Sequence, residues 1–234
     1  MIETVAFDAD DTLWHNEHLF QDTQKKLEAI VQRYRPGEDI HEALFAVEMR
    51  NLELFGYGIK GFTLSMVEAA VQLTGERISA ADIHEIVQLG KTMIAAPVDL
   101  LDGVEETLDV VAGRYRLVLI TKGDIVDQTS KIERSGLADR FEQVEIVPRK
   151  DAAVYRTVFG RHGIDPARSV MVGNSMPSDV LPMLELGGHG VHVPYALVWG
   201  HEAHDADPVN DRFHRLQRLA ELPALLERLG SGRR

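Results

Sequence analysis

The segment VAFDADDTLW, residues Val5–Trp14, joins a short apolar run to three carboxylates, Asp8, Asp10 and Asp11. Like charges this close repel one another, and their place at the end of an apolar run makes them costly to bury. The arrangement becomes favourable only beside a positively charged partner. The apolar run itself, from Ile2 to Phe7, predicts a short buried strand.

The composition narrows the class of protein. The chain has 234 residues, 44% of them hydrophobic, which is enough for one large domain or a domain with an insert. Its formal net charge of -12 predicts no binding to nucleic acid and none to an anionic membrane surface. It has no cysteine, so disulfides, thiolate catalysis and Cys-ligated zinc are excluded. No stretch approaches the roughly 20 apolar residues of a membrane helix and no secretory leader is visible, so we expect a cytoplasmic protein.

Two patterns follow the first strand. Helical periodicity predicts four helices at residues 18–34, 39–56, 63–75 and 79–96, the last with Ser79 as its N-cap. From Pro97 on, short apolar runs alternate with helical segments, which is typical of βαβ units in a parallel sheet. These later strands are predicted at residues 116–121, 143–147, 169–173 and 190–193. We therefore predict an α/β core formed by residues 1–14 and 97–234, with an inserted helical cap domain at residues 15–96.

Four polar segments lie at or just after the ends of predicted strands. They are Asp8–Thr12, Thr121, Lys150 and the run GNSMPSD, residues Gly173–Asp179. The carboxyl ends of parallel strands face the ligand crevice of an open sheet, so the four segments are candidates for one site. Each segment alone also has a structural interpretation, as a helix cap or, for Lys150, as a solvated side chain. Their joint order and spacing favour a common site.

In this order the four segments resemble the motifs of the haloacid dehalogenase (HAD) superfamily of hydrolases. The family motif D-x-D-x-T is matched by DADDT, residues 8–12, and its Thr at the end of an apolar strand by Thr121 in LVLIT. Its Lys is matched by Lys150, and its acidic run by residues 173–179. The insert between the first two motifs resembles the family's helical, C1-type cap. The resemblance implies a Rossmann-like parallel-sheet core that carries this cap.

The resemblance also implies a phosphatase mechanism. Asp8 would attack phosphorus and form an aspartyl-phosphate, and Asp10 would exchange protons with the leaving group and with water. Thr121, Lys122 and Lys150 would hold the phosphoryl oxygens, and Lys150 would also offset the charge of Asp8.

The positive partner that the resemblance implies is Mg²⁺, together with Lys150. Its expected ligands are an Asp8 carboxylate oxygen, the main-chain carbonyl of Asp10 and the fourth motif, with Asn174 and Asp179 near the ion. Asp179 is expected to act directly or through water. Asn174 stands where the family usually has an acid, so we expect weaker binding of Mg²⁺.

The expected substrate is a small phosphorylated metabolite, such as a nucleotide or a sugar phosphate. Gln128 and Lys131, which follow the TKGD segment, resemble the family subgroup that includes nucleotidases. Dehalogenases of the family lack the second acid of the first motif, so Asp10 favours ester hydrolysis. A haloacid dehalogenase-type hydrolase, a phospho-accepting signalling module and a catalytically degraded phosphate-binding protein stay open as alternatives. The chain does not decide between a monomer and a homodimer.

Two further features have ordinary interpretations. The histidines 189, 192, 201 and 204 admit a zinc site, but HEAH lacks the H-E-x-x-H spacing and surface histidines are favoured. Tyr195 and Trp199 either pack on the core or help to close a pocket. The Gly-rich segment 54–62, with Tyr57 and Lys60, is interpreted as a hinge, a substrate contact or a helix–helix loop.

Overall fold

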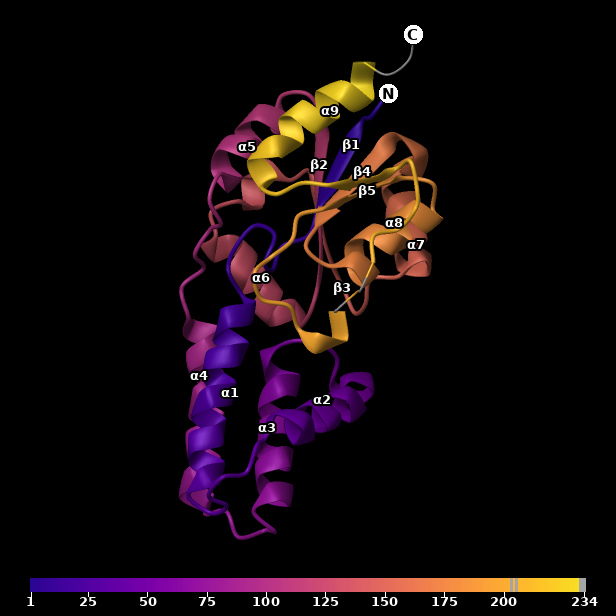
Figure 1. Ribbon diagram of the computed structural model, residues 1–234. Coiled ribbons are helices and arrows are strands. Elements are labelled where there is room, and N and C mark those ends of the chain that lie inside the picture. Colours follow the sequence, from indigo (N-terminus) through magenta and orange to yellow (C-terminus); the bar gives the residue numbers. More distant parts are fainter. Residues whose placement is uncertain (203, 205, 232–234) are drawn as a thin grey trace. The chain divides into compact units, whose positions relative to one another are not determined.

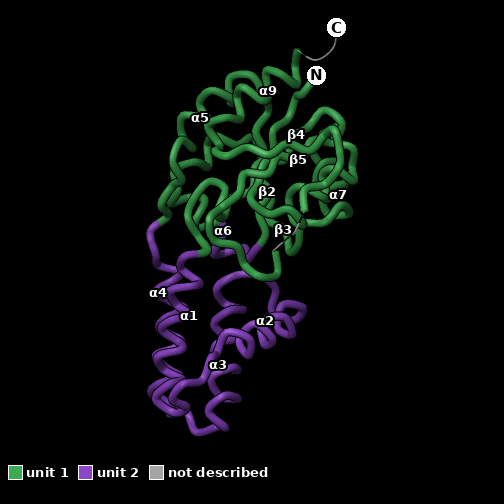
Figure 2. The backbone as a smooth tube through the Cα atoms, viewed as in Figure 1, with its two compact units in different colours: residues 1–17, 98–122, 129–234 green, residues 18–97, 123–128 purple. Residues whose placement is uncertain are grey.

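The computed structural model describes residues 1–202, 204 and 206–231 and divides into two compact units (Figure 2). The first, here the sheet unit, holds residues 1–17, 98–122 and 129–234. The second, here the helical unit, holds residues 18–97 and 123–128. Each unit has hydrophobic side chains buried in a core of its own.

The sheet unit is built on one parallel sheet. Over the described residues, six strands pair in the order β3-β2-β1-β4-β5-β6, and all neighbours run parallel (Figure 1). The strands are β1 (Thr4–Phe7), β2 (Arg116–Lys122), β3 (Gln143–Val147), β4 (Ser169–Gly173), β5 (His189–His192) and β6 (Phe213–Arg215). The predicted Rossmann-like α/β fold is thereby confirmed, and β3 and β4 have the bounds expected from the sequence.

Helices cover the sheet on both faces. Val5 and Phe7 of β1 pack in one cluster with side chains of α5, α6 and α9, while Ala6 packs in another with side chains of α7 and α8. Figure 1 shows α5 and α9 on one side of the strands and α7 and α8 on the other. Because β1 and β4 are covered on both sides, they are buried along their whole length, and most of their residues are apolar. These helices are α5 (Val104–Ala112), α6 (Ile125–Arg134), α7 (Ala152–His162), α8 (Leu181–Glu185) and α9 (Leu222–Ser231).

The strand order switches direction beside β1. The strands that follow β1 in the chain, β2 and β3, extend the sheet to one edge, and β4, β5 and β6 extend it to the other. Ligands of open α/β sheets bind at the carboxyl ends of strands where the order switches in this way. The segment after β1 begins with Asp8 and the segment after β4 begins with Asn174, so both flank this point.

The helical unit contains α1 (Glu17–Gln32), α2 (His41–Phe55), α3 (Ile59–Leu73) and α4 (Ala80–Ala95), with Glu17 counted in the sheet unit. The apolar stripe of α1 is buried in the core of this unit at Leu27, Ile30 and Val31. The Ser79 hydroxyl accepts a hydrogen bond from the Asp82 amide at 3.1 Å, so the predicted N-cap of α4 is present.

Residues 123–128 belong to the helical unit, although they follow β2 directly. Lys60 forms an ion pair with Asp124 at 2.8 Å, and the position of a Cβ on Gly58 would lie 3.3 Å from the Asp124 amide nitrogen. Gly123 has a φ of 146°, a value that suits glycine alone. The unit boundary therefore falls inside the TKGD segment, and α6 begins in one unit and ends in the other.

Three local features differ from the sequence-based expectation. Strand β6 was not predicted, because three residues including a histidine and an arginine give no apolar run. A π-helical turn, Met176–Val180, precedes the short α8, whereas the segment SDVLPMLELG, residues 178–187, predicts one regular helix. The sequence predicts a last helix around residues 219–229 followed by a Gly/Ser/Arg tail; α9 instead continues to Ser231, and residues 232–234 lie outside the described residues. No helix in the described part of the chain is long and apolar enough to cross a membrane.

Candidate active site

A tight turn after β1 sets the direction of each acidic side chain. The Asp8 amide donates to the Val172 carbonyl oxygen at 2.9 Å, so pairing between β1 and β4 continues to Asp8. The chain then reverses, with the Leu13 amide donating to the Ala9 carbonyl oxygen at 2.8 Å and Asp11 at a φ of 61°. Aspartate tolerates this left-handed conformation better than most residues. Neighbouring carboxylates consequently leave the turn in different directions.

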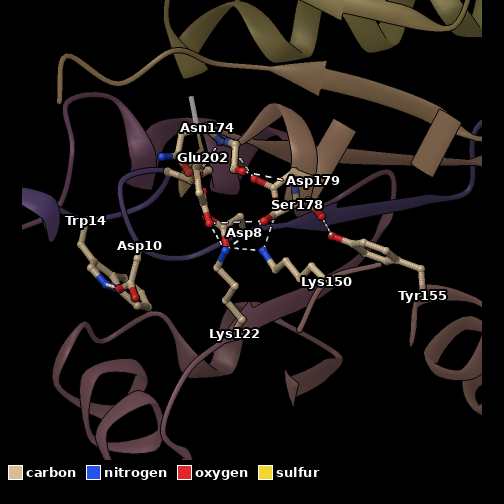
Figure 3. A network of polar contacts seen from close by, with 12 residues as sticks. Asp8, Asp10, Trp14, Lys122, Lys150, Tyr155, Asn174, Ser178, Asp179 and Glu202 are labelled. Atoms are coloured by element: carbon tan, nitrogen blue, oxygen red, sulfur yellow. Dashed lines mark hydrogen bonds and ion pairs between the residues drawn. The ribbon is translucent and has the colours of Figure 1, made fainter. Parts of the chain in front are cut away.

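Asp8, Lys150 and Asp179 form a buried ion-paired group (Figure 3). The Lys150 ammonium contacts Asp8 Oδ1 directly and lies 2.7 Å from Asp179 Oδ1. The three side chains are 1%, 9% and 0% exposed for Lys150, Asp8 and Asp179. Lys150 is therefore not a solvated lysine, and the structure brings three predicted site residues together.

Burial affects the two kinds of group in opposite ways. Burial raises the pKa of Asp8 to about 6, and the ammonium of Lys150 opposes that rise. Burial alone would lower the pKa of Lys150, but the charges of Asp179 and Asp8 outweigh it and raise the pKa overall. Two carboxylates thus share one ammonium, and a further cation would offset the excess negative charge.

Thr12 connects the turn after β1 with the turn after β4. Its hydroxyl donates to Asp8 Oδ2 at 3.1 Å and accepts from the main-chain amide of Asn174 at 3.1 Å. Thr12 is 2% exposed, so water cannot easily replace these partners. On the other side, His192 Nε2 lies 2.9 Å from the main-chain oxygen of Asn174. The first and fourth motifs are consequently held in register.

The side-chain amide of Asn174 faces oxygen atoms, which bears on the expected Mg²⁺. With the amide nitrogen inward, it donates to Asp8 Oδ2 at 3.2 Å and to the Asp10 main-chain oxygen at 3.3 Å. With the amide oxygen inward, three oxygens face one another, and a hard cation such as Mg²⁺ takes carboxylate and carbonyl oxygens of this kind. These residues therefore fit the ion.

Asp179 has protein partners on both carboxylate oxygens. Besides the contact with Lys150, its Oδ2 accepts from the Ser175 amide at 3.0 Å. This favours an indirect role beside a metal over direct ligation. Throughout the described residues, no group of three or more His, Cys, Asp or Glu side chains is placed to hold a metal ion. The residues that fit Mg²⁺ differ from such a group, because beside the Asp8 carboxylate they include the Asn174 amide and the main-chain carbonyl of Asp10.

Lys122, at the end of β2, pairs with groups that the sequence did not indicate. Its ammonium forms an ion pair with Glu202 and donates to the Ser178 hydroxyl at 2.9 Å (Figure 3). Burial and, next in importance, the charge of Lys150 lower the pKa of Lys122 to about 8. Figure 3 shows the ammonium groups of Lys122 and Lys150 beside Asp8.

Asp10 lies in a different environment from Asp8. Its Oδ1 accepts from Trp14 Nε1 at 2.6 Å, and Lys131 contacts Oδ1 and Oδ2 at 2.6 and 2.8 Å. Figure 3 shows Asp10 and Trp14 to one side of the group around Asp8. Asp10 follows β1 as predicted, whereas its contacts with Trp14 and Lys131 were not expected from the sequence.

Asp11 serves the start of α1. Its carboxylate accepts from the amides of Asn16 at 2.8 Å and of Glu17 at 3.0 Å. Burial raises the pKa of Asp11 to about 7 against these hydrogen bonds. The helix-cap interpretation of the acidic run is therefore right for this one residue.

The remaining predicted site residue, Thr121, lies where β2 ends. The site also contains residues that the sequence did not indicate, and these come from other segments of the chain. Thr121 is the penultimate residue of β2 and 1% exposed, so it is buried at the carboxyl edge of the sheet. Trp14 could have been found from its spacing of four residues from Asp10. Ser178 lies inside the predicted run 173–179 but was not singled out as a site residue, and Glu202 ends a short 3-10 turn, Gly200–Glu202, whose position no periodicity reveals.

Three of the four histidines that suggested zinc, His189, His192 and His201, have other partners. The rings of His189 and His214 stack, with centroids 5.3 Å apart, and His192 supports Asn174 as described. His201 lies against Trp199. Tyr195 shares a hydrogen bond of 2.7 Å with His15 Nδ1.

Comparisons with known proteins agree with this geometry. The family model of the haloacid dehalogenase-like hydrolases matches residues 2–187. A haloacid dehalogenase-like family hydrolase from Xanthomonas campestris is 41% identical, and its crystal structure has a TM-score of 0.89 over 97% of this chain and 91% of that one. A 2-haloacid dehalogenase from Pseudomonas syringae pv. Tomato DC3000, 23% identical, shares the fold with a TM-score of 0.65 over 98% and 100% of the two chains.

A curated relative carries a more specific description. The phosphatase YigB of Escherichia coli K12, described as acting on 5-amino-6-(5-phospho-D-ribitylamino)uracil, is 27% identical over 152 residues. That match spans 61% of this chain and 60% of YigB. Because the family model covers most of the chain, and the motif residues lie at the carboxyl edge of the sheet, the protein belongs to the haloacid dehalogenase-like hydrolases.

Proposed function

We propose that this hydrolase is a phosphatase that cleaves a small phosphomonoester with Mg²⁺ as cofactor, through an aspartyl-phosphate. The observation that carries the proposal is the environment of Asp8. It is a buried carboxylate at a strand end, with Lys150 on one oxygen and Thr12 on the other. A second carboxylate, Asp10, follows two residues later, and the description of YigB as a phosphatase gives further support.

In the proposed reaction, an oxygen of Asp8 attacks phosphorus, the bond from phosphorus to the leaving oxygen breaks, and Asp10 protonates that oxygen. In the second half, water attacks phosphorus while Asp10 accepts its proton. The bond between phosphorus and Asp8 then breaks, which releases phosphate and restores the carboxylate. Lys122, Lys150 and Thr121 bind phosphoryl oxygens and hold the group in place.

The metal would be held by Asp8, the main-chain carbonyl of Asp10 and Asn174, with Asp179 acting through water because both of its oxygens have protein partners. When bound, Mg²⁺ supplies positive charge that offsets the negative charge of the phosphoryl oxygens. We also propose that the helical insert, residues 15–96 by the sequence, serves as a cap that excludes water and selects the substrate.

The proposed substrates are small phosphorylated metabolites such as nucleotides and sugar phosphates. The compound named for YigB combines a polyol phosphate with a heterocycle, so it and its simpler parts belong in the first panel. The match of 27% identity over 61% of this chain guides the choice of panel and does not name the substrate.

The test is release of inorganic phosphate from p-nitrophenyl phosphate and from this panel, with Mg²⁺ and with EDTA. We expect release that needs Mg²⁺ and that falls to background in Asp8→Asn. The matched control is Asp102→Asn, the same change at an exposed turn residue, which should retain activity. Halide release from 2-haloacids without any phosphate release would contradict the proposal and favour the dehalogenase alternative.

A further inference from the structure

Lys131 is a nearly buried cation that the proposed reaction does not use. It lies on the part of α6 that belongs to the sheet unit, and its side chain is 10% exposed. Its ammonium contacts Oδ1 and Oδ2 of Asp10 at 2.6 and 2.8 Å and Oδ1 of Asn16 at 3.2 Å. An ammonium group has three hydrogen atoms to donate, and these contacts provide three acceptors.

The contacts hold the Asp10 carboxylate from two directions. Trp14, which is 1% exposed, donates from Nε1 to Asp10 Oδ1 at 2.6 Å, on the oxygen that Lys131 also contacts. A buried lysine is retained at a cost in desolvation, so its pairing with both oxygens of one carboxylate calls for a reason beyond packing. Neither Lys131 nor Trp14 is among the residues that contact Asp8 in the described hydrogen bonds.

We propose that Lys131, assisted by Trp14, is a positioning residue that fixes Asp10 where it exchanges protons with the leaving group. The inference rests on the proposed phosphatase function. A carboxylate on a free side chain can rotate away from the leaving oxygen, and a misplacement of about 1 Å can cost roughly 100-fold in rate. Because Lys131 would act through Asp10, it is not itself a catalytic residue.

The leaving group separates this role from a purely structural one. p-Nitrophenolate departs with little need for a proton, whereas an alkoxide departs only when it is protonated. The parameter kcat/KM depends only on the steps from free enzyme and substrate up to departure of the leaving group, and not on the later hydrolysis of the aspartyl-phosphate. Loss of positioning should therefore lower kcat/KM far more for an alkyl phosphate than for p-nitrophenyl phosphate, while damage to the fold should lower both equally.

The experiment measures kcat/KM for glycerol phosphate and for p-nitrophenyl phosphate in Lys131→Met, Lys131→Arg, Asp10→Asn and the double variant Asp10→Asn/Lys131→Met. We expect Lys131→Met to lower the alkyl value by about 100-fold and the aryl value by less than about tenfold. Lys131→Arg can still contact both oxygens and should recover part of the alkyl value. The double variant should be no slower than Asp10→Asn. Lys91→Met, the same change at an exposed position of α4, should alter neither value.

Three results would overturn the proposal. One is an equal loss for both esters, and another is a double variant clearly slower than Asp10→Asn. If Lys131→Met does not fold, the ratio of alkyl to aryl kcat/KM is taken from Lys131→Gln, which lacks the charge, and an unchanged ratio there is the third. A wild-type protein that cleaves neither ester would instead remove the proposed function, so the two failures are distinguishable.

Discussion

Asp8, Asp10 and Asp11 are neighbours in the sequence and have three different tasks in the structure. Asp8 is ion-paired with Lys150, Asp10 is held by Lys131, and Asp11 caps the first helix. The left-handed conformation of Asp11 and the reversal after Ala9 separate the side chains. The backbone geometry of the turn therefore gives three aspartates that are close in the sequence three different environments.

Asn174 offers a prediction about metal affinity. In Asn174→Asp, a charged carboxylate replaces the neutral amide that faces Asp8 Oδ2 and the Asp10 carbonyl. A cation should offset this added charge, so we expect half-maximal activity at a Mg²⁺ concentration about tenfold lower, equivalent to about 1.4 kcal/mol. A Mg²⁺ titration of phosphate release measures it. An unchanged or higher requirement would show that Asn174 does not contact the metal.

The sequence predicted the positions of site residues better than their partners. Asp8, Thr121, Lys150 and Asn174 could be located because each follows an apolar strand, and strand ends meet at one edge of a parallel sheet. Glu202 could not be located, since it approaches Lys122 from a loop with no periodic pattern. Site residues supplied by loops are fixed by tertiary contacts alone.

At the scale of elements, β4 and the π-helical turn after it pack too closely for any side chain at Gly173. A Cβ there would lie 2.1 Å from Asp179 Oδ2 and 2.3 Å from its Cγ. Since Asp179 is fixed by Lys150 and by the Ser175 amide, it cannot easily move away. The ion-paired group of Asp8, Lys150 and Asp179 therefore requires glycine at position 173, because a side chain there would displace Asp179.

We therefore expect Gly173→Ala to lower the free energy of unfolding by about 3 kcal/mol, as overpacking of a rigid site does. Urea unfolding measures the change. The matched control is Gly160→Ala in α7, where a Cβ meets nothing within 4 Å and should stabilise the helix by about 0.5–1 kcal/mol. Equal effects of the two substitutions would contradict the packing explanation.

The β5–β6 edge predicts a dependence of stability on pH. Burial, together with His214, lowers the pKa of His189 to about 4 from an ordinary value of 6.5, and burial lowers the pKa of His214 as well. The unfolded chain therefore binds these protons at a higher pH than the folded protein. The contribution of the neutral pair is present above pH 6.5 and is lost as the pH falls toward 4.

His189→Gln should accordingly lose less stability than the wild type between pH 7 and pH 4.5, because glutamine stays neutral. Urea unfolding at several pH values, with the exposed His84→Gln as control, measures the difference. Parallel curves for the wild type and His189→Gln would rule out a role for this pair.

The elements could be predicted where the pattern was long or strongly apolar. The strands predicted at residues 143–147 and 169–173 have the same bounds as β3 and β4, because an apolar run between turn residues is typical of a buried strand. β6 could not be predicted, since its three residues pair only because β5 presents an open edge. The π-helical turn Met176–Val180 was not predicted either, because the sequence pattern indicates a helix without fixing its hydrogen-bond spacing.

At the scale of the whole molecule, two units with separate cores should open separately. Gly90 of α4 packs against Thr63 of α3, and a Cβ on Gly90 would lie 2.1 Å from the Thr63 hydroxyl oxygen. Gly90→Ala should therefore destabilise the helical unit by about 2 kcal/mol, after the gain in helix propensity is subtracted. The sheet unit should keep its stability.

Hydrogen exchange measures this prediction by region. We expect faster exchange of amides in residues 18–97 and also in residues 123–128, which belong to the same unit. Amides of β1 and β4 should exchange as in the wild type. A uniform acceleration along the whole chain would mean that the two units unfold together.

The membership of residues 123–128 in the helical unit limits how the insert can be exchanged between relatives. A chimera that takes only residues 18–97 from another family member would leave Asp124 behind while replacing Lys60, its partner at 2.8 Å. The incoming helices would meet a foreign loop directly after Lys122. A workable graft therefore needs two donor pieces, residues 18–97 and 123–128, transferred together.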